Sequence, residues 1–167
     1  MLDFFLVFLI LLTGVRGEDV RWNNKTTRAL SGTVQSPTPK PLWQPSVGAK
    51  WQIILNSTII LNSSMPLEPK NVKIFELDLF DTPKATITEL RNRGIRVICY
   101  FSGGTSEDWR PDFASFKNED KGSCLPRWVG ERYIDIRKEG IFEVMKARIG
   151  LAAEKGCDAI DPDNIGI

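Results

Sequence analysis

The chain has 167 residues, a formal net charge of +1 and no histidine. This length fits one domain but falls short of the roughly 250 residues of a complete (β/α)8 barrel. The near-neutral charge leaves no basic stripe, so a nucleic-acid partner is not expected. Without histidine, imidazole metal sites, Ser-His-Asp triads and histidine general bases are excluded, and carboxylates become the strongest candidates for acid and base chemistry.

Residues 1–17 have the pattern of a secretory signal peptide. An apolar run over 4–12 precedes Val15 and Gly17, which have the spacing of a small-residue cleavage site. The run is too short to span a bilayer, so no membrane span is expected. Asp3 stands where a basic residue is usual, which leaves open an ordinary buried N-terminal segment. The pattern predicts a secreted, extracellular protein.

The next segment predicts a flexible leader before a domain at 42–167. Residues 18–41 are polar, rich in Ser, Thr and Pro, and without an apolar period. Glycosylation sequons begin at Asn24, Asn56 and Asn62, which a secreted eukaryotic protein could use.

The three cysteines, Cys99, Cys124 and Cys157, make an odd number. In an oxidising compartment at least one stays free, pairs with another chain, or has its partner outside this sequence. Their spacing matches no zinc motif, so neither a metal site nor a cofactor is expected. Cys99 and Cys157 fall on neighbouring expected strands, but this does not establish that their side chains face each other.

From residue 51 onward, short β-rich runs alternate with helical ones. Strands are expected at 51–55, 72–80 and 96–102, and in the apolar run after Gly156. The repeated strand-helix-strand order implies a parallel sheet with right-handed crossovers. We expect an α/β fold of the (β/α)8 TIM-barrel type, ending after about the fourth strand.

Two helices are expected between these strands. The first should be capped by Asp81 or Thr82, with Pro83 as its first residue, and should stop at Gly94. The second follows an apolar period over 141–152, which Arg148 interrupts, so that this side chain snorkels to solvent or meets a carboxylate. The connection over 105–132 is long enough to suggest a functional loop.

Sites in parallel α/β folds gather at the carboxyl ends of the strands. This rule collects seven residues, five of them acids: Asp78, Asp81, Tyr100, Ser102, Glu107, Asp161 and Asp163. Paired carboxylates of this kind serve glycosidases. Blander interpretations remain at each position: a turn at 161–164, a helix cap at Asp81, a solvated loop pair at 107–108, and simple packing for Trp109 and Trp128.

Six ordered sequence blocks within 42–167 resemble glycoside hydrolase family 114. They are WQI (51–53), LDLFDTP (77–83), VICYFSGG (97–104), EDWRPD (107–112), YIDIR (133–137) and KGCDAIDPDN (155–164). Members of this family are secreted TIM-barrel enzymes of the endo-α-1,4-polygalactosaminidase type, also labelled α-galactosidase-like. The resemblance implies a retaining α-glycosidase that cleaves α-1,4-linked galactosamine or α-galactoside polymers with two carboxylates and no metal.

The resemblance also assigns roles to residues. It places the nucleophile at Asp163 and puts Asp78 and Tyr100 in blocks that contact the sugar. Asp161, on the face of Asp163, and Trp109, which could stack on a sugar, complete the expected binding set. The acid/base of the family is a Glu on a later strand, which would lie beyond Ile167, so we expect this chain to be inactive alone.

The expected partner is a polysaccharide or oligosaccharide, and the oligomeric state is left open. The alternative function is that of a non-catalytic carbohydrate-binding or partner-completed fragment.

Overall fold

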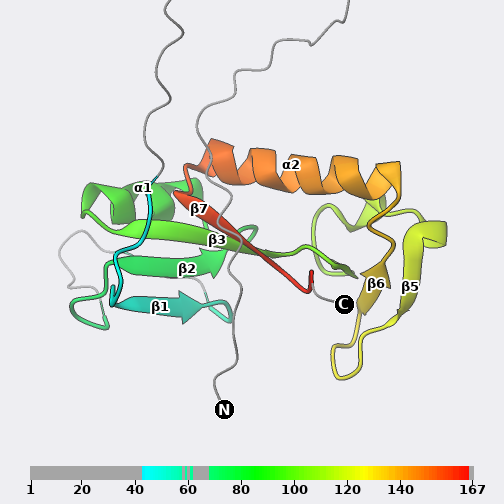
Figure 1. Ribbon diagram of the computed structural model, residues 1–167, viewed down its shortest axis with the longest axis horizontal. Coiled ribbons are helices and arrows are strands. Elements are labelled where there is room, and N and C mark those ends of the chain that lie inside the picture. Colours follow the sequence, from blue (N-terminus) through cyan, green and yellow to red (C-terminus); the bar gives the residue numbers. More distant parts are fainter. Residues whose placement is uncertain (1–42, 58, 60, 62–67, 166–167) are drawn as a thin grey trace, which may run out of the picture.

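The computed structural model describes residues 43–57, 59, 61 and 68–165 (Figure 1). The predicted signal peptide and leader, with the sequons at Asn24 and Asn62, lie outside the described residues. Within the described part of the chain, neither helix is long and apolar enough to cross a membrane.

Four parallel strands form the main sheet in the order β1-β2-β3-β7. They are β1 (Trp51–Ile54), β2 (Ile74–Asp78), β3 (Arg96–Ser102) and β7 (Ala159–Asp163). The predicted parallel α/β fold is confirmed, and the acidic run that also fitted a turn is strand through Asp163. Closure of these strands into an eight-stranded barrel remains a prediction.

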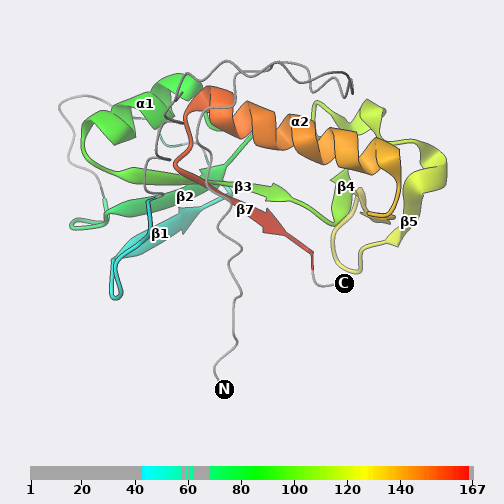
Figure 2. The ribbon, with the colours of Figure 1, turned by 45° about the horizontal axis from the view of Figure 1, so that its top comes forward.

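Helices α1 (Lys84–Asn92) and α2 (Glu139–Lys155) lie on the same side of this sheet (Figures 1 and 2). Strand side chains alternate in direction, so every second residue faces the helices. These positions are apolar, and they form one buried cluster with side chains of both helices: Phe75, Leu77, Val97, Cys99, Phe101, Ile160, Ile87, Leu90 and Ala152. The opposite face of the sheet is therefore the one left for polar side chains.

The start of α1 differs from the predicted cap. Pro83 is the N-cap residue, and no side chain caps the helix. Asp81 lies two residues earlier, too far back to reach the first free amides, and its Oδ2 is instead 3.4 Å from the Arg110 guanidinium. The prediction that Asp81 or Thr82 caps this helix was wrong. Gly156, with φ of 87°, ends α2.

The connection predicted as a loop over 105–132 contains a second, antiparallel sheet. Its strands run in the order β4-β6-β5, with bounds β4 (Thr105–Glu107), β5 (Lys121–Cys124) and β6 (Glu131–Ile134). Two 3-10 turns, Phe113–Ser115 and Asn118–Asp120, lie between β4 and β5. These strands are short and polar, with little of the apolar alternation that marks a strand in sequence.

Gly130 makes the turn into β6 possible. Its φ is 89°, and a Cβ at this position would lie 2.5 Å from the Asp108 carboxylate. The backbone conformation favours glycine here, and any larger residue would also push the exposed Asp108 carboxylate aside.

Arg148 is a buried cation that joins α2 to the main sheet. Its side chain is 1% exposed and donates to both Asp112 oxygens at 2.7 and 3.0 Å. A third donor reaches the Ser102 carbonyl at 2.6 Å. Of the two predicted environments, the carboxylate partner is confirmed, and the pair fixes α2 against the end of β3.

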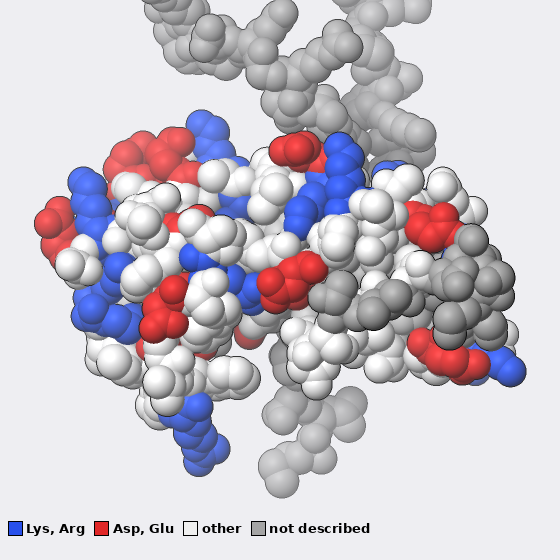
Figure 3. Space-filling view, turned by 180° about the vertical axis from the view of Figure 1, so that it is seen from behind, with Lys and Arg blue, Asp and Glu red and all other residues white. Residues whose placement is uncertain are grey.

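Acidic and basic side chains intermingle on the surface seen from behind in Figure 3. Neither sign forms a continuous stripe across that face. This distribution matches the net charge of +1. The absence of a nucleic-acid partner stays a prediction.

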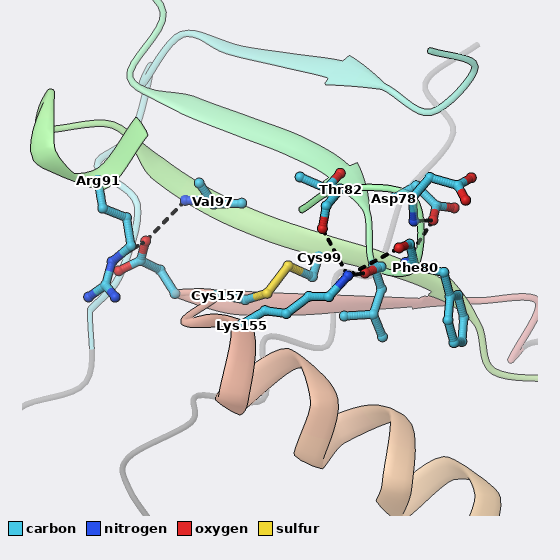
Figure 4. Close-up of a disulfide and its surroundings, with 11 residues drawn as sticks. Asp78, Phe80, Thr82, Arg91, Val97, Cys99, Lys155 and Cys157 are labelled. Atoms are coloured by element: carbon cyan, nitrogen blue, oxygen red, sulfur yellow. Dashed lines mark hydrogen bonds and ion pairs between the residues drawn. A yellow bond between two sulfur atoms is a disulfide. The ribbon is translucent and has the colours of Figure 1, made fainter. Parts of the chain in front are cut away.

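A disulfide between Cys99 and Cys157 resolves the pairing that the sequence left open (Figure 4). It joins Cys99 of β3 to Cys157, which lies two residues before β7, and their Cα atoms are 6.0 Å apart. The next residue, Asp158, accepts hydrogen bonds from Arg96 at 2.6 Å and from the Val97 amide at 3.0 Å. Together these contacts fasten the start of β7 to β3, while Cys124 is exposed and free.

Removing this disulfide should destabilise the protein measurably. Because the bond closes a loop with a sequence separation of 58, the Cys99→Ala/Cys157→Ala variant is expected to lose about 2–4 kcal/mol of unfolding free energy in urea titrations. Cys124→Ala is the matched control and should change the unfolding free energy by less than about 0.5 kcal/mol. Equal losses in the two variants would contradict this assignment.

Candidate functional site

The strand register brings polar side chains together on the face turned away from the helices. Asp78 of β2 pairs with Tyr100 of β3, and Tyr100 pairs in turn with Asp161 of β7. One step further along, Ser102 pairs with Asp163. All these residues share a face because parallel strands keep the direction of side chains at paired positions.

Tyr100 and Asp163 form the contact at the centre of the site. The phenol hydroxyl donates a hydrogen bond to Asp163 Oδ2 at 3.0 Å. Burial, followed by the negative charge of Asp163, raises the pKa of Tyr100 above its ordinary value. The phenol therefore stays protonated at neutral pH and remains a hydrogen-bond donor.

A cavity of about 100 Å³ lies beside this contact. It is lined by Tyr100, Glu107, Trp109, Leu125, Trp128, Glu131, Asp163 and Asn164. The two tryptophans are 49% and 62% exposed, so their rings are available to a ligand. Three carboxyl groups and two aromatic faces suit a hydroxylated ligand that carries a positive charge.

Arg110 occupies the space between Asp78 and Glu107. Its guanidinium donates to both Asp78 oxygens, at 2.9 and 2.6 Å, and its Nε lies 3.1 Å from Glu107. Burial raises the pKa of Glu107, and the nearby Arg110 opposes that rise. Asp78 also accepts from the Phe80 and Asp81 amides at 2.8 and 2.9 Å, so it holds the turn after β2 in place.

A buried hydrogen-bond chain supports the residue after Asp163. Thr105 donates to Glu131 and contacts the Ser102 hydroxyl. Asn164 donates to Ser102 at 3.1 Å and approaches Glu131 at 3.5 Å. This chain joins the ends of β3 and β7 to the second sheet, and it holds Asn164 in a left-handed conformation with φ of 60°.

The cavity gathers Tyr100, Trp109 and Asp163 from the predicted site. Asp78 is buried against Arg110 and is outside the lining of this cavity, and Asp161 lines a different cavity with Glu76. The roles predicted for all five residues stay predictions. In the described part of the chain, no three Cys, Asp or Glu side chains are arranged to hold a metal ion.

Sequence reasoning missed Glu131 as a site residue. It reaches the cavity because β6 pairs antiparallel with β4, which sets Glu131 opposite Glu107. The two residues are far apart along the chain, and no local pattern around position 131 predicts this pairing.

The chain belongs to the glycoside-hydrolase family GH114. The model of this family matches residues 32–166, in agreement with the sequence blocks. The comparison with curated proteins finds no match.

Two solved structures show the same fold. The crystal structure of Ega3 from Aspergillus fumigatus, in complex with galactosamine, is 40% identical with a TM-score of 0.67, and the match covers 77% of this chain and 49% of that one. The glycoside hydrolase domain of PelA from Pseudomonas aeruginosa is 13% identical with a TM-score of 0.57, covering 71% of this chain and 45% of that one. This chain therefore spans about half the length of either solved chain.

Interrupting the chain of hydrogen bonds at Thr105 tests whether it is structural. Thr105→Val keeps the shape of the side chain but leaves the buried Glu131 and Ser102 without their shared partner, so it should lower the unfolding free energy by about 1–3 kcal/mol. Thr88→Val is the matched control, because the Thr88 hydroxyl bonds only locally to Lys84 on the exposed side of α1. If Thr105→Val lowers the unfolding free energy no more than Thr88→Val does, the hydrogen-bond chain is not a structural support.

Proposed function

We propose that this chain carries the nucleophile and part of the sugar-binding surface of a secreted glycoside hydrolase that acts on α-1,4-linked galactosamine or α-galactoside polymers. One observation carries the proposal. Asp163 is hydrogen-bonded to Tyr100 at 3.0 Å in a cavity walled by exposed tryptophans and further acids, within a member of GH114. The similarity to a structure holding galactosamine supports the choice of sugar.

Asp163 would attack the anomeric carbon in a retaining mechanism. Tyr100 holds Oδ2, so we assign the attack to Oδ1. A retaining glycosidase needs a second carboxyl group about 5–5.5 Å away to protonate the leaving oxygen. The family resemblance places that acid on a Glu of a later strand.

The cavity walls would recognise an amino sugar by charge and by shape. Glu107 and Glu131 supply negative charge toward the ammonium group, and Trp109 and Trp128 offer flat faces for the sugar ring. Asp161 lies on the same sheet face and would meet a polymer that extends along it. Asp78 would act through Arg110, by holding the end of β2 in place.

Binding of galactosamine oligomers, measured by titration calorimetry, tests the sugar-binding surface. Trp109→Ala should weaken the affinity by about two- to tenfold, because it removes a cation–π and stacking face. Phe142→Ala is the control, since Phe142 is an equally exposed aromatic residue on α2, outside the cavity. Wild-type protein without affinity for these oligomers would defeat the proposed function.

The alternative function, a non-catalytic carbohydrate-binding module, is favoured by the exposure of Trp109 and Trp128. Asp163→Asn separates the two functions in a chain extended through the later strands of the family. Loss of reducing-end release with retained oligomer binding indicates the enzyme. Retained binding by an extended wild-type chain that releases no amino sugar indicates the binding module.

A further inference from the structure

Glu76 is a buried acid that the proposed reaction does not use. It lies at the middle of β2, on the sheet face turned away from the helices, and is 5% exposed. Its cavity of about 260 Å³ has mainly apolar walls, including Trp51, Ile74 and Ile98. Asp161 is the other acid in that lining, so the two carboxyl groups face the same cavity.

Two carboxyl groups can share a hydrogen bond only if one of them carries a proton. A cation beside the pair could remove the need for this proton, but the two nearby arginines in the described part of the chain have other partners. Arg110 donates to Asp78, and Arg96 donates to Asp158 at 2.6 Å.

Among the described strands, the other groups that face Glu76 add no positive charge. The strand β1 (WQII) has no charged residue and sets Ile53 opposite Glu76. On β3, Tyr100 is neutral, and on β7 both Asp161 and Asp163 are acids. The surroundings of Glu76 therefore favour its neutral form.

We propose that Glu76 and Asp161 hold one proton between them, with protonated Glu76 donating to the Asp161 carboxylate, and that this pair limits the negative charge beside Asp163. Glu76 is thus a positioning residue. Its effect on Asp163 rests on the proposed function, whereas the shared proton does not.

The pH dependence that follows has a definite sign. Burial, followed by the hydrogen bond to Asp161, raises the pKa of Glu76 from 4.5 to about 8 in the folded protein. The folded state then keeps a proton that the unfolded chain loses above about pH 4.5. The stability that this proton contributes is fully present below about pH 4.5 and is lost as the pH rises to about 8.

Urea unfolding between pH 5 and 9 tests the shared proton in the full 167-residue chain. Relative to Glu76→Gln, which mimics the neutral acid, the unfolding constant of the wild type should rise by up to about tenfold per pH unit until about pH 8. The absence of histidine keeps other titrations in this window few. Glu119→Gln makes the same chemical change at an exposed position and should follow the wild type.

Asp161→Asn distinguishes a shared proton from burial alone. Removing the accepting carboxylate should lower the pKa of Glu76. The unfolding free energy should then stop falling at a lower pH than in the wild type. Carboxyl-carbon NMR of labelled glutamate gives the same titration directly in the wild type, should Glu76→Gln fail to fold. The proposal is overturned if Glu76→Gln follows the wild-type profile, if no glutamate besides Glu107 titrates well above pH 5, or if Asp161→Asn leaves the pH range of the stability loss unchanged. Failure of oligomer binding alone would defeat the proposed function and leave this result standing.

Discussion

The parallel pairing of β2, β3 and β7 is the constraint on which the rest of the molecule depends. Because side chains alternate and paired positions share a direction, this register separates an apolar face from an acidic one. The apolar face is covered by α1 and α2. The other face places Tyr100 between Asp78 and Asp161, and Ser102 beside Asp163. A shift of one residue in any strand would exchange the two faces and remove the site.

Two buried arginines connect this sheet to the elements around it. Arg148 joins α2 to Asp112 and to the end of β3, and Arg110 joins the segment after β4 to Asp78. A buried guanidinium is costly unless its donors are used, and here most donors reach carboxylates or a carbonyl. The exception is Arg110 Nε, which lies 3.1 Å from Glu107 without forming a hydrogen bond. These contacts make the connection between β3 and α2 a fixed wall of the cavity, which carries Trp109 on its surface.

The acids on this face of the sheet repel one another, and the fold reduces this repulsion through several contacts. Arg110 neutralises Asp78 and Glu107, while Tyr100 donates to Asp163 with a phenol that stays protonated. Glu131 is satisfied by the hydroxyl of Thr105. Like charges can be packed densely when most have a donor, and an amino sugar with a positive charge would complete this balance.

The sequence by itself determined the parallel strands, the two helices, the family and the acids at the strand ends, because each is written in local periodicity or in contiguous blocks. It placed Tyr100 and Asp163 near one another through the rule that parallel strands end at one edge, and it proposed Trp109 as a residue that could stack on a sugar. Only the tertiary structure decided the Cys99–Cys157 pairing, the burial of Asp78 against Arg110 and the arrival of Glu131 in the cavity. Each joins segments distant in the chain, so its geometry depends on packing and on antiparallel pairing that no local pattern encodes.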